Sequence, residues 1–577
     1  MKPSLAVEID GGGQFMTRAS SCVLSRALLH SVFVVLACCV LSVMAAEANV
    51  KVNCNIVGQT ITQALIDNAT VSPLVLVVRG PCVENVVIAR DDVTIKTNGV
   101  VAASISALDL GLAVIALDGA HRIRIDGLAP GISISGGVYG VAATRGATAR
   151  LANCDVSSAS NSAAIASFGS TLEIDSCDLH DNNRGGVASN ESSLIVTNST
   201  SENNQNEGIL AVRSSYVRVG QNRNGDTVAQ PVTVNHNLTH GISVLDSSSA
   251  TIVATNIQNH VNGNGISIQR SSAATIGTGT NGFVSPNTIQ GSGVWGVSVY
   301  QASSALIQGN TITSNSRGVG VNETASATII GNNIQNNTAR GVQVGEKSSA
   351  KIGVNDGANA TSANTISNNG SDGIGIFDGG EGVVAGNTIS SNGGNGISMN
   401  MGTMNLVGGN TISANASHGI FVGASRLFQG PGTFGTLPDT ADVSQNNGLA
   451  GLFLFNNSSA DLYRITLSGN AREGIGASLN STINLHVYDA ARPNNFISVT
   501  GNGTANVPNQ NDGITLFSAS MLASPQKPNP GDQGQIIITG QPGWGVNCFG
   551  NTTKAAVGMD TTGISGNAAG TVNCGGF

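Results

Sequence analysis

Five copies of one phrase within residues 296–422 decide the fold of this chain: Gly318-Val-Gly-Val321, Gly341-Val-Gln-Val344, Gly373-Ile-Gly-Ile376, Gly396-Ile-Ser-Met399 and Gly419-Ile-Phe-Val422. Their first glycines are 23, 32, 23 and 23 residues apart. A second phrase, Asn-x-Ile, recurs between them and begins at Asn310, Asn332, Asn364, Asn387 and Asn410. Two β-type phrases in each period of about 23 residues indicate a solenoid, in which every period forms one coil.

Each regular period predicts a strand, a turn, a second strand, a turn and a short third strand. Because side chains alternate along a strand, the first and third positions after the glycine should face the core and the second and fourth should face solvent. The Asn-x-Ile asparagines and a second set should form two stacked ladders at the corners. The second set is Asn315, Asn337, Asn369, Asn392 and Asn415.

The spacing of the anchor residues along the whole chain predicts about fifteen coils. Several periods are longer, and their extra residues follow the second strand. They are residues 220–231, 277–286, 353–362 and 429–440. Insertions that recur at one corner place loops along one edge of a solenoid, where they can wall a groove.

Residues 53–577 resemble the right-handed parallel β-helix proteins of the pectin-lyase-like superfamily. The resemblance rests on the repeated phrases, the asparagine corners and an N-terminal arrangement of Cys54, a short helix and Cys82-Val-Glu-Asn-Val86. It implies an all-β, single-stranded solenoid with a short N-terminal capping helix. Members include polysaccharide lyases, hydrolases, uronate epimerases, phage tailspikes and adhesin-like surface proteins, so the fold alone does not choose an activity.

The domain organisation follows from composition and from the two ends of the chain. Residues 1–48 read as a signal peptide with a long n-region, because the apolar run 31–44 precedes the small residues Ala45, Ala46 and Ala48. We expect an N-terminal cap and first coils at 49–110, the parallel β-helix at 111–545 and a C-terminal cap at 546–577. The protein is therefore expected to be periplasmic, extracellular or at the cell surface. A net charge of -8 without a dense run of basic residues argues against nucleic acid as a partner.

Six cysteines remain after the predicted signal peptide, and an even number in an exported chain suggests disulfides. Cys54 with Cys82 and Cys548 with Cys574 would staple the terminal caps. Cys154 and Cys177 lie 23 residues apart, one period, so they would stack on neighbouring coils within disulfide range. Free thiols are the alternative for all three pairs.

One column of acidic residues is expected on three consecutive coils. Glu323, Glu346 and Asp378 each lie five residues past a glycine anchor. Like charges about 4.8 Å apart are unfavourable unless they are paired, protonated or bridged by a cation. Calcium suits such oxygens, and the resemblance also implies it, since some polysaccharide lyases of this fold hold calcium on stacked carboxylates. The alternative is three solvated turn carboxylates that point apart.

A glycan-binding surface is expected on the outward face of the glycine-phrase strands. Arg317 and Arg340 directly precede their glycines and should stack on neighbouring coils, either as part of a binding subsite or as residues that only serve solubility. Exposed rings on a β surface can stack on sugars; the alternative is that the long loops cover them. The rings that fall on the outward face are Tyr300, Phe377, Phe421, Phe453 and Phe455.

Two classes of function fit these patterns. The first is an exported, non-catalytic β-helix that binds polysaccharide or acts at the cell surface, and it is favoured because no complete set of acid, base and arginine can be placed on one face. The second is a polysaccharide lyase, hydrolase or uronate epimerase. Its catalytic candidates are Asp178, His180 and Asp181, which are similar to the acidic-histidine cluster of uronate epimerases except that Leu179 stands where that motif has proline.

Overall fold

The computed structural model describes residues 48–129, 131–355, 360–430, 440–486, 495–505, 510–524, 535–549, 556–557 and 563–574. The predicted signal peptide lies outside these residues, apart from Ala48 itself. Within the described part of the chain, no helix is long and apolar enough to cross a membrane.

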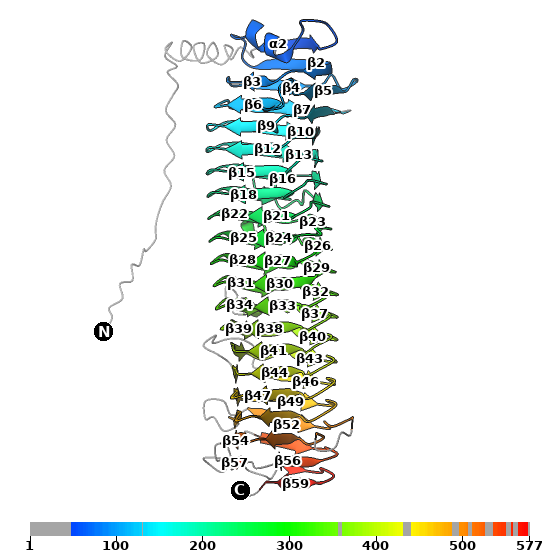
Figure 1. The fold of residues 1–577 in the computed structure, drawn as a ribbon, viewed down its shortest axis with the longest axis vertical. Coiled ribbons are helices and arrows are strands. Elements are labelled where there is room, and N and C mark those ends of the chain that lie inside the picture. The colour runs from blue at the N-terminus through cyan, green and yellow to red at the C-terminus, as the bar shows by residue number, and fades with distance from the viewer. Residues whose placement is uncertain are drawn as a thin grey trace, which may run out of the picture. The chain divides into compact units, whose positions relative to one another are not determined.

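The unit that begins at Ala48 is a parallel β-solenoid whose coils stack in sequence order (Figure 1). One coil contains β30 (Arg317–Val321), β31 (Ser326–Ile330) and β32 (Asn333–Gln335). Each strand pairs in parallel with its equivalent one coil later, as Val319 does with Val342 and Ile334 with Ile366. The three stacks of strands are called sheet A, which contains β31, sheet B, which contains β32, and sheet C, which contains β30.

The five glycine phrases form neighbouring strands of sheet C, as the alternation predicts. These are β30, β33 (Val342–Val344), β38 (Ile374–Phe377), β41 (Ile397–Asn400) and β44 (Ile420–Gly423). Val319 and Val321 are fully buried in the core. The anchor glycine is needed at the corner, because a Cβ on Gly318 would lie 2.3 Å from the carbonyl oxygen of Gly341 on the next coil.

Both asparagine ladders are confirmed. In the first ladder, the side-chain oxygen of Asn364 accepts the backbone N–H of Asn332 at 2.9 Å and its side-chain amide at 3.0 Å. In the second, Asn369 accepts the same two groups from Asn337. The side-chain amides also donate to backbone carbonyls of the preceding coil, as Asn364 does to Ile329. The corners are therefore held by buried polar groups that satisfy one another.

The N-terminal opening is covered by α2 (Ile61–Asp67), which buries Ile61, Ala64 and Leu65 as its spacing predicts. Glu84 holds the start of this helix, because its carboxylate accepts the backbone N–H groups of Ile61 at 2.7 Å and Thr62 at 2.9 Å. Disulfides join Cys54 to Cys82 and Cys548 to Cys574, as predicted for the two ends.

The third predicted disulfide is wrong. Cys154 and Cys177 are both free and buried, although they stack on neighbouring coils as expected. The backbone N–H of Cys154 donates to the sulfur of Cys177 at 3.4 Å. Each thiol instead lies against a carbonyl two residues before it in the chain, Cys154 against Ala152 and Cys177 against Asp175, both at 3.3 Å.

The number of coils is larger than expected, because sheet C has nineteen strands among the described residues. The additional coils carry β3 (Val86–Ile88), β6 (Ile115–Asp118) and β59 (Gly570–Asn573). By register, their anchor positions hold Asn85, Val114 and Thr571 instead of glycine. A count based on glycine therefore misses them.

Candidate binding groove

A groove of about 1080 Å³ lies on the outward face of sheet A. Nine strands form it, and the eight spacings between them, at about 4.8 Å each, give a length of about 38 Å. They are β19 (Tyr216–Val219), β22 (Ser249–Ile252), β25 (Ala273–Ile276), β28 (Ser304–Gln308), β31, β34 (Ser349–Ile352), β39 (Glu381–Val384), β42 (Thr403–Leu406) and β45 (Arg426–Gln429).

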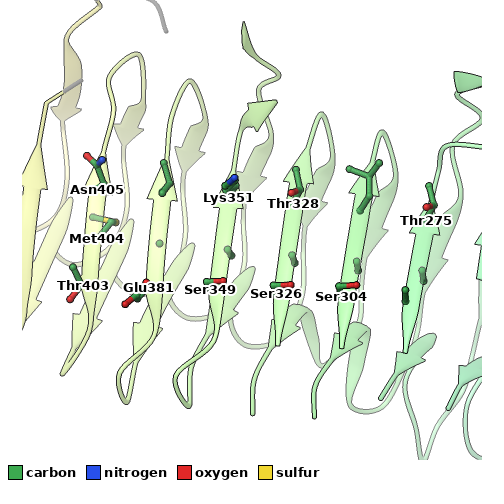
Figure 2. Close-up of a pocket in the computed structure, with 18 of the residues that line it drawn as sticks. Thr275, Ser304, Ser326, Thr328, Ser349, Lys351, Glu381, Thr403, Met404 and Asn405 are labelled. Carbon is green, nitrogen blue, oxygen red and sulfur yellow. The ribbon is translucent and has the colours of Figure 1, made fainter. Parts of the chain in front are cut away.

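Two parallel rows of outward side chains make the floor of the groove, and eight of these seventeen side chains are serine or threonine (Figure 2). The first row is Tyr216, Ser249, Ala273, Ser304, Ser326, Ser349, Glu381, Thr403 and Arg426. The second row is Thr251, Thr275, Leu306, Thr328, Lys351, Val383, Asn405 and Phe428. The groove is hollow because serine, threonine and alanine leave the backbone close to the surface, while larger side chains stand at both ends.

The predicted insertions follow strands of sheet A, so their loops stand along one edge of the groove. Residues 220–231 follow β19, and residues 277–286 follow β25. Gln221 joins these two loops, because its side-chain oxygen accepts the backbone N–H and the hydroxyl of Thr280, both at 3.1 Å. The groove itself is lined by residues of the strands, so a wall made by these loops stays a prediction; residues 353–362 and 429–440 lie partly outside the described residues.

The predicted acidic column borders the opposite edge of the groove. Glu323, Glu346 and Asp378 are stacked in the turns from sheet C to sheet A, where the backbone N–H of Thr324 donates to the carbonyl of Glu346. All three side chains are exposed. The acidic column is not among the described groups of three or more side chains whose ligand atoms lie close enough to share a metal ion. The group that meets this criterion is Cys54, Cys82 and Glu84, and its two cysteines form a disulfide. Calcium binding by the acidic column stays a prediction.

The seven residues predicted to bind glycan lie on sheet C and none of them lines the groove. Arg317 and Arg340 are in register on neighbouring coils, but each guanidinium covers a different ring: Trp295 at 5.1 Å and Phe377 at 4.4 Å. Arg340 also pairs with Asp372 at 3.2 Å.

The remaining aromatic candidates also lie on the outward face of sheet C. Phe421 and Phe453 stack at 6.3 Å, and His418 stacks on Phe453 at 4.9 Å. Phe455 stays exposed, and Tyr300 is half-buried. Several of these rings are thus covered by neighbouring side chains on the sheet itself.

A cluster that the sequence reading missed lies directly beyond the C-terminal end of the groove. Asp461 on β48 (Ser459–Leu462) accepts from Asn484 at 2.8 Å and contacts Nε2 of His486 at 3.0 Å and Arg426 at 3.5 Å. Tyr463 stacks on the His486 ring at 4.7 Å. Burial alone would raise the pKa of Asp461, but these partners lower it below its ordinary value, so the carboxylate is ionised.

The catalytic candidates of the sequence reading lie on sheet B, away from the groove. His180 on β14 (Asp178–His180) lies between Asp155 at 2.9 Å and Asp181 at 2.8 Å. Burial lowers the pKa of His180, but these two hydrogen bonds outweigh it and raise the pKa. Burial raises the pKa of Asp178, which lines a separate hollow of about 520 Å³ with Cys154 and Cys177.

The comparisons with known proteins agree with this architecture. The model of the family described as right handed beta helix region matches residues 130–229, 221–356 and 346–431, more than half of the chain. No curated protein sequence matches.

Three of the solved structures that match have low identity to this chain and low TM-scores. The periplasmic alginate epimerase AlgG is 12% identical, with 76% of this chain and 82% of that chain covered and a TM-score of 0.24. The alginate lyase from Paenibacillus sp. str. FPU-7 is 14% identical (60% and 95%, TM-score 0.24). The Azotobacter vinelandii mannuronan C-5 epimerase AlgE6 A-module is 12% identical (86% and 93%, TM-score 0.22). The coil-by-coil register and the family match together show that this chain belongs to the right-handed β-helix family.

Proposed function

We propose that this protein is exported and binds a carbohydrate chain, without chemistry, along the groove of sheet A. The observation that carries the proposal is the set of outward hydroxyl groups on the floor, which seven of the nine parallel strands supply. Sugar hydroxyls both donate and accept hydrogen bonds, and serine and threonine hydroxyls can do the same. An extended β-linked sugar chain advances by about one strand spacing per ring. Successive rings can therefore contact successive coils, each ring at the first-row and second-row positions of its coil.

The disulfides at both ends support an exported location, because such bonds persist in oxidising compartments. The expected partner is thus a glycan of the cell surface or the surroundings.

Filling the groove is expected to abolish binding. Thr328→Trp places a large ring in the middle of the floor, where it would occupy the space of a sugar, and we expect binding to weaken by about a hundredfold or more. The measurement is a glycan array followed by calorimetry on each positive glycan. Gln335→Trp is the matched control, because Gln335 lies on the same coil and faces outward from sheet B. Equal binding by both variants would contradict the proposal.

The cluster beyond the groove supports a second candidate, a polysaccharide lyase or epimerase. Because Asp461 is ionised, the Nε2 of His486 that faces it carries the proton and Nδ1 holds the lone pair that can accept one. Arg426 can pair with the carboxylate of an acidic sugar. A hydrolase is less well supported, because Glu381 and Asp461 are three coils apart and offset by two residues along the strand, which separates them by about 16 Å, whereas paired glycosidase carboxylates are about 5 to 9.5 Å apart.

The second candidate predicts turnover that depends on His486. Incubation of acidic polysaccharides in heavy water would give an unsaturated product or deuterium in the sugar ring, and His486→Gln should lower either rate by about a hundredfold or more. Calorimetry should show that the variant still binds the polymer. If no polymer that binds gives either an unsaturated product or deuterium in the sugar ring, the lyase or epimerase function is excluded and only the non-catalytic function stays.

A further inference from the structure

The N-terminal end of the groove is closed by the loop of residues 221–230. Ile195, on β16 (Ser193–Thr197), faces outward one coil before the groove begins, yet it is only 6% exposed. Together with Glu173 it lines a small hollow whose other wall is this loop. Arg223 reaches back to Glu173 at 3.4 Å. The loop therefore lies across the face of sheet A over the two coils that precede the groove.

Arg218 fixes this loop to the first strand of the groove. Its guanidinium donates to the backbone carbonyls of Asn222 at 2.8 Å and Arg223 at 2.9 Å. It also donates to the hydroxyl of Tyr216 at 3.0 Å and lies over the Tyr216 ring. An aromatic ring and an arginine, both held by other contacts, therefore form the N-terminal end of the groove.

The C-terminal end is closed in a similar way by Arg426, Phe428 and Tyr463. The Tyr463 ring lies 5.3 Å from the Phe428 ring. It leans toward the groove, because a Cβ on Gly430 of the preceding coil would lie 3.0 Å from a Tyr463 ring carbon. Behind it, Asp461 points outward from sheet A but only 14% of its side chain is exposed. Large packed side chains thus stand where the floor has serine and threonine.

The charges along the groove do not favour a polyanion. Glu323, Glu346 and Asp378 lie on one rim, and Glu381 lies on the floor. In this middle stretch the carboxylates outnumber Lys347 and Lys351. The same column continues toward the N-terminal end with Arg213, Asp246 and Arg270, where Arg270 is paired with Asp246 at 3.2 Å. A ligand with a charge on every ring would meet repulsion from this rim, whereas a neutral sugar chain would not.

We propose that the groove binds a neutral, extended oligosaccharide of bounded length and excludes the interior of a long chain. The inference rests on the proposed function and adds the class and size of the ligand. A length of about 38 Å holds about eight sugar rings at one ring per coil. A longer chain must leave the groove at one end, where it meets either the loop of residues 221–230 or the Phe428 and Tyr463 rings.

The test is calorimetry with neutral β-1,4-linked gluco-, manno- and xylo-oligosaccharides from the dimer to the dodecamer. For a series that binds, we expect affinity to rise about tenfold or more from tetramer to octamer and to fall by at least about tenfold at the dodecamer. Phe428→Ser, which continues the floor with a small side chain, should restore dodecamer binding; Arg426→Ser is a second variant of the same end. Phe168→Ala is the control, since Phe168 is an exposed aromatic residue outside the groove.

The outcomes separate this inference from the proposed function. Tight dodecamer binding by the wild type, with several protein molecules on one long chain, would overturn the closed groove but leave carbohydrate binding intact. A preference for acidic over neutral chains would overturn the assigned class. Failure of every neutral and acidic chain to bind would overturn the proposed function itself.

Discussion

Replacing Asn364 with alanine is expected to lower the free energy of unfolding by about 4 kcal/mol. Asn364 is fully buried in the middle of the first ladder. Its side chain accepts two hydrogen bonds from Asn332 and donates to Ile329 and Asn387, both at 2.8 Å. Alanine would leave the backbone N–H of Asn332 buried without this acceptor and would remove the donors to Ile329 and Asn387. The side-chain amide of Asn332 keeps the carbonyls of Ile307 and Ile330. Each buried group left without a partner costs about 1 to 3 kcal/mol.

Urea denaturation followed by circular dichroism measures this effect. Thr365→Ala is the matched control, because Thr365 is the next residue and its side chain is exposed on β37 (Thr365–Ser367). We expect the control to change stability by less than about 0.5 kcal/mol. Equal effects of the two substitutions would mean that the ladder contributes nothing beyond an ordinary surface position.

Replacing Glu473 with glutamine is expected to stabilise the protein at alkaline pH. Glu473 is 2% exposed on the sheet C side, and its Oε2 has no hydrogen-bond partner among the described residues. Burial raises the pKa of Glu473 to about 7, from an ordinary value of 4.5, and the nearby Asp512 raises it further while Arg472 opposes the shift. The folded state therefore holds this proton more tightly than the unfolded chain does.

The stability effect of Glu473 has a definite pH window. Because the folded pKa lies above the unfolded one, the wild type loses stability as pH rises from about 4.5 to 7, by about 3 kcal/mol. Glutamine cannot ionise, so Glu473→Gln should be more stable than the wild type by about this amount at pH 8 and about equal to it at pH 4. Thermal denaturation at both pH values measures it, with the exposed Glu191→Gln as control. The same gain at both pH values would point to packing instead of charge.

The repeated phrases were sufficient to predict most of the coils, because the contacts at these corners favour glycine and asparagine strongly. Gly318 has no room for a Cβ, and Asn364 both donates and accepts along its ladder. Residues under such constraints recur visibly at a fixed spacing. The coil of Val114, which lacks the glycine, was missed for the same reason.

The groove was harder to predict from the sequence, because its depth comes from the short side chains of its floor. Aromatic rings and charges stand out in a sequence, and they mark Phe421 and Arg340 on sheet C. The floor of sheet A is marked instead by the phrase Ser326-Ala-Thr-Ile329 and its relatives, whose outward side chains are merely short. Counting positions from that phrase aligns Phe428 with Asp461 and would have pointed to the cluster at the end of the groove.

The pair of terminal disulfides determines where this solenoid can begin to come apart. In a stack of coils, each coil contacts only its neighbours, and the outermost coils, with one neighbour each, would otherwise detach first. Cys54–Cys82 and Cys548–Cys574 tie those outermost segments to the adjoining strands. Unzipping from the ends is thereby blocked while both bonds are intact, and separation must start between two interior coils, where contacts on both sides have to be lost. The lifetime of the folded protein is therefore coupled to the redox state of its surroundings.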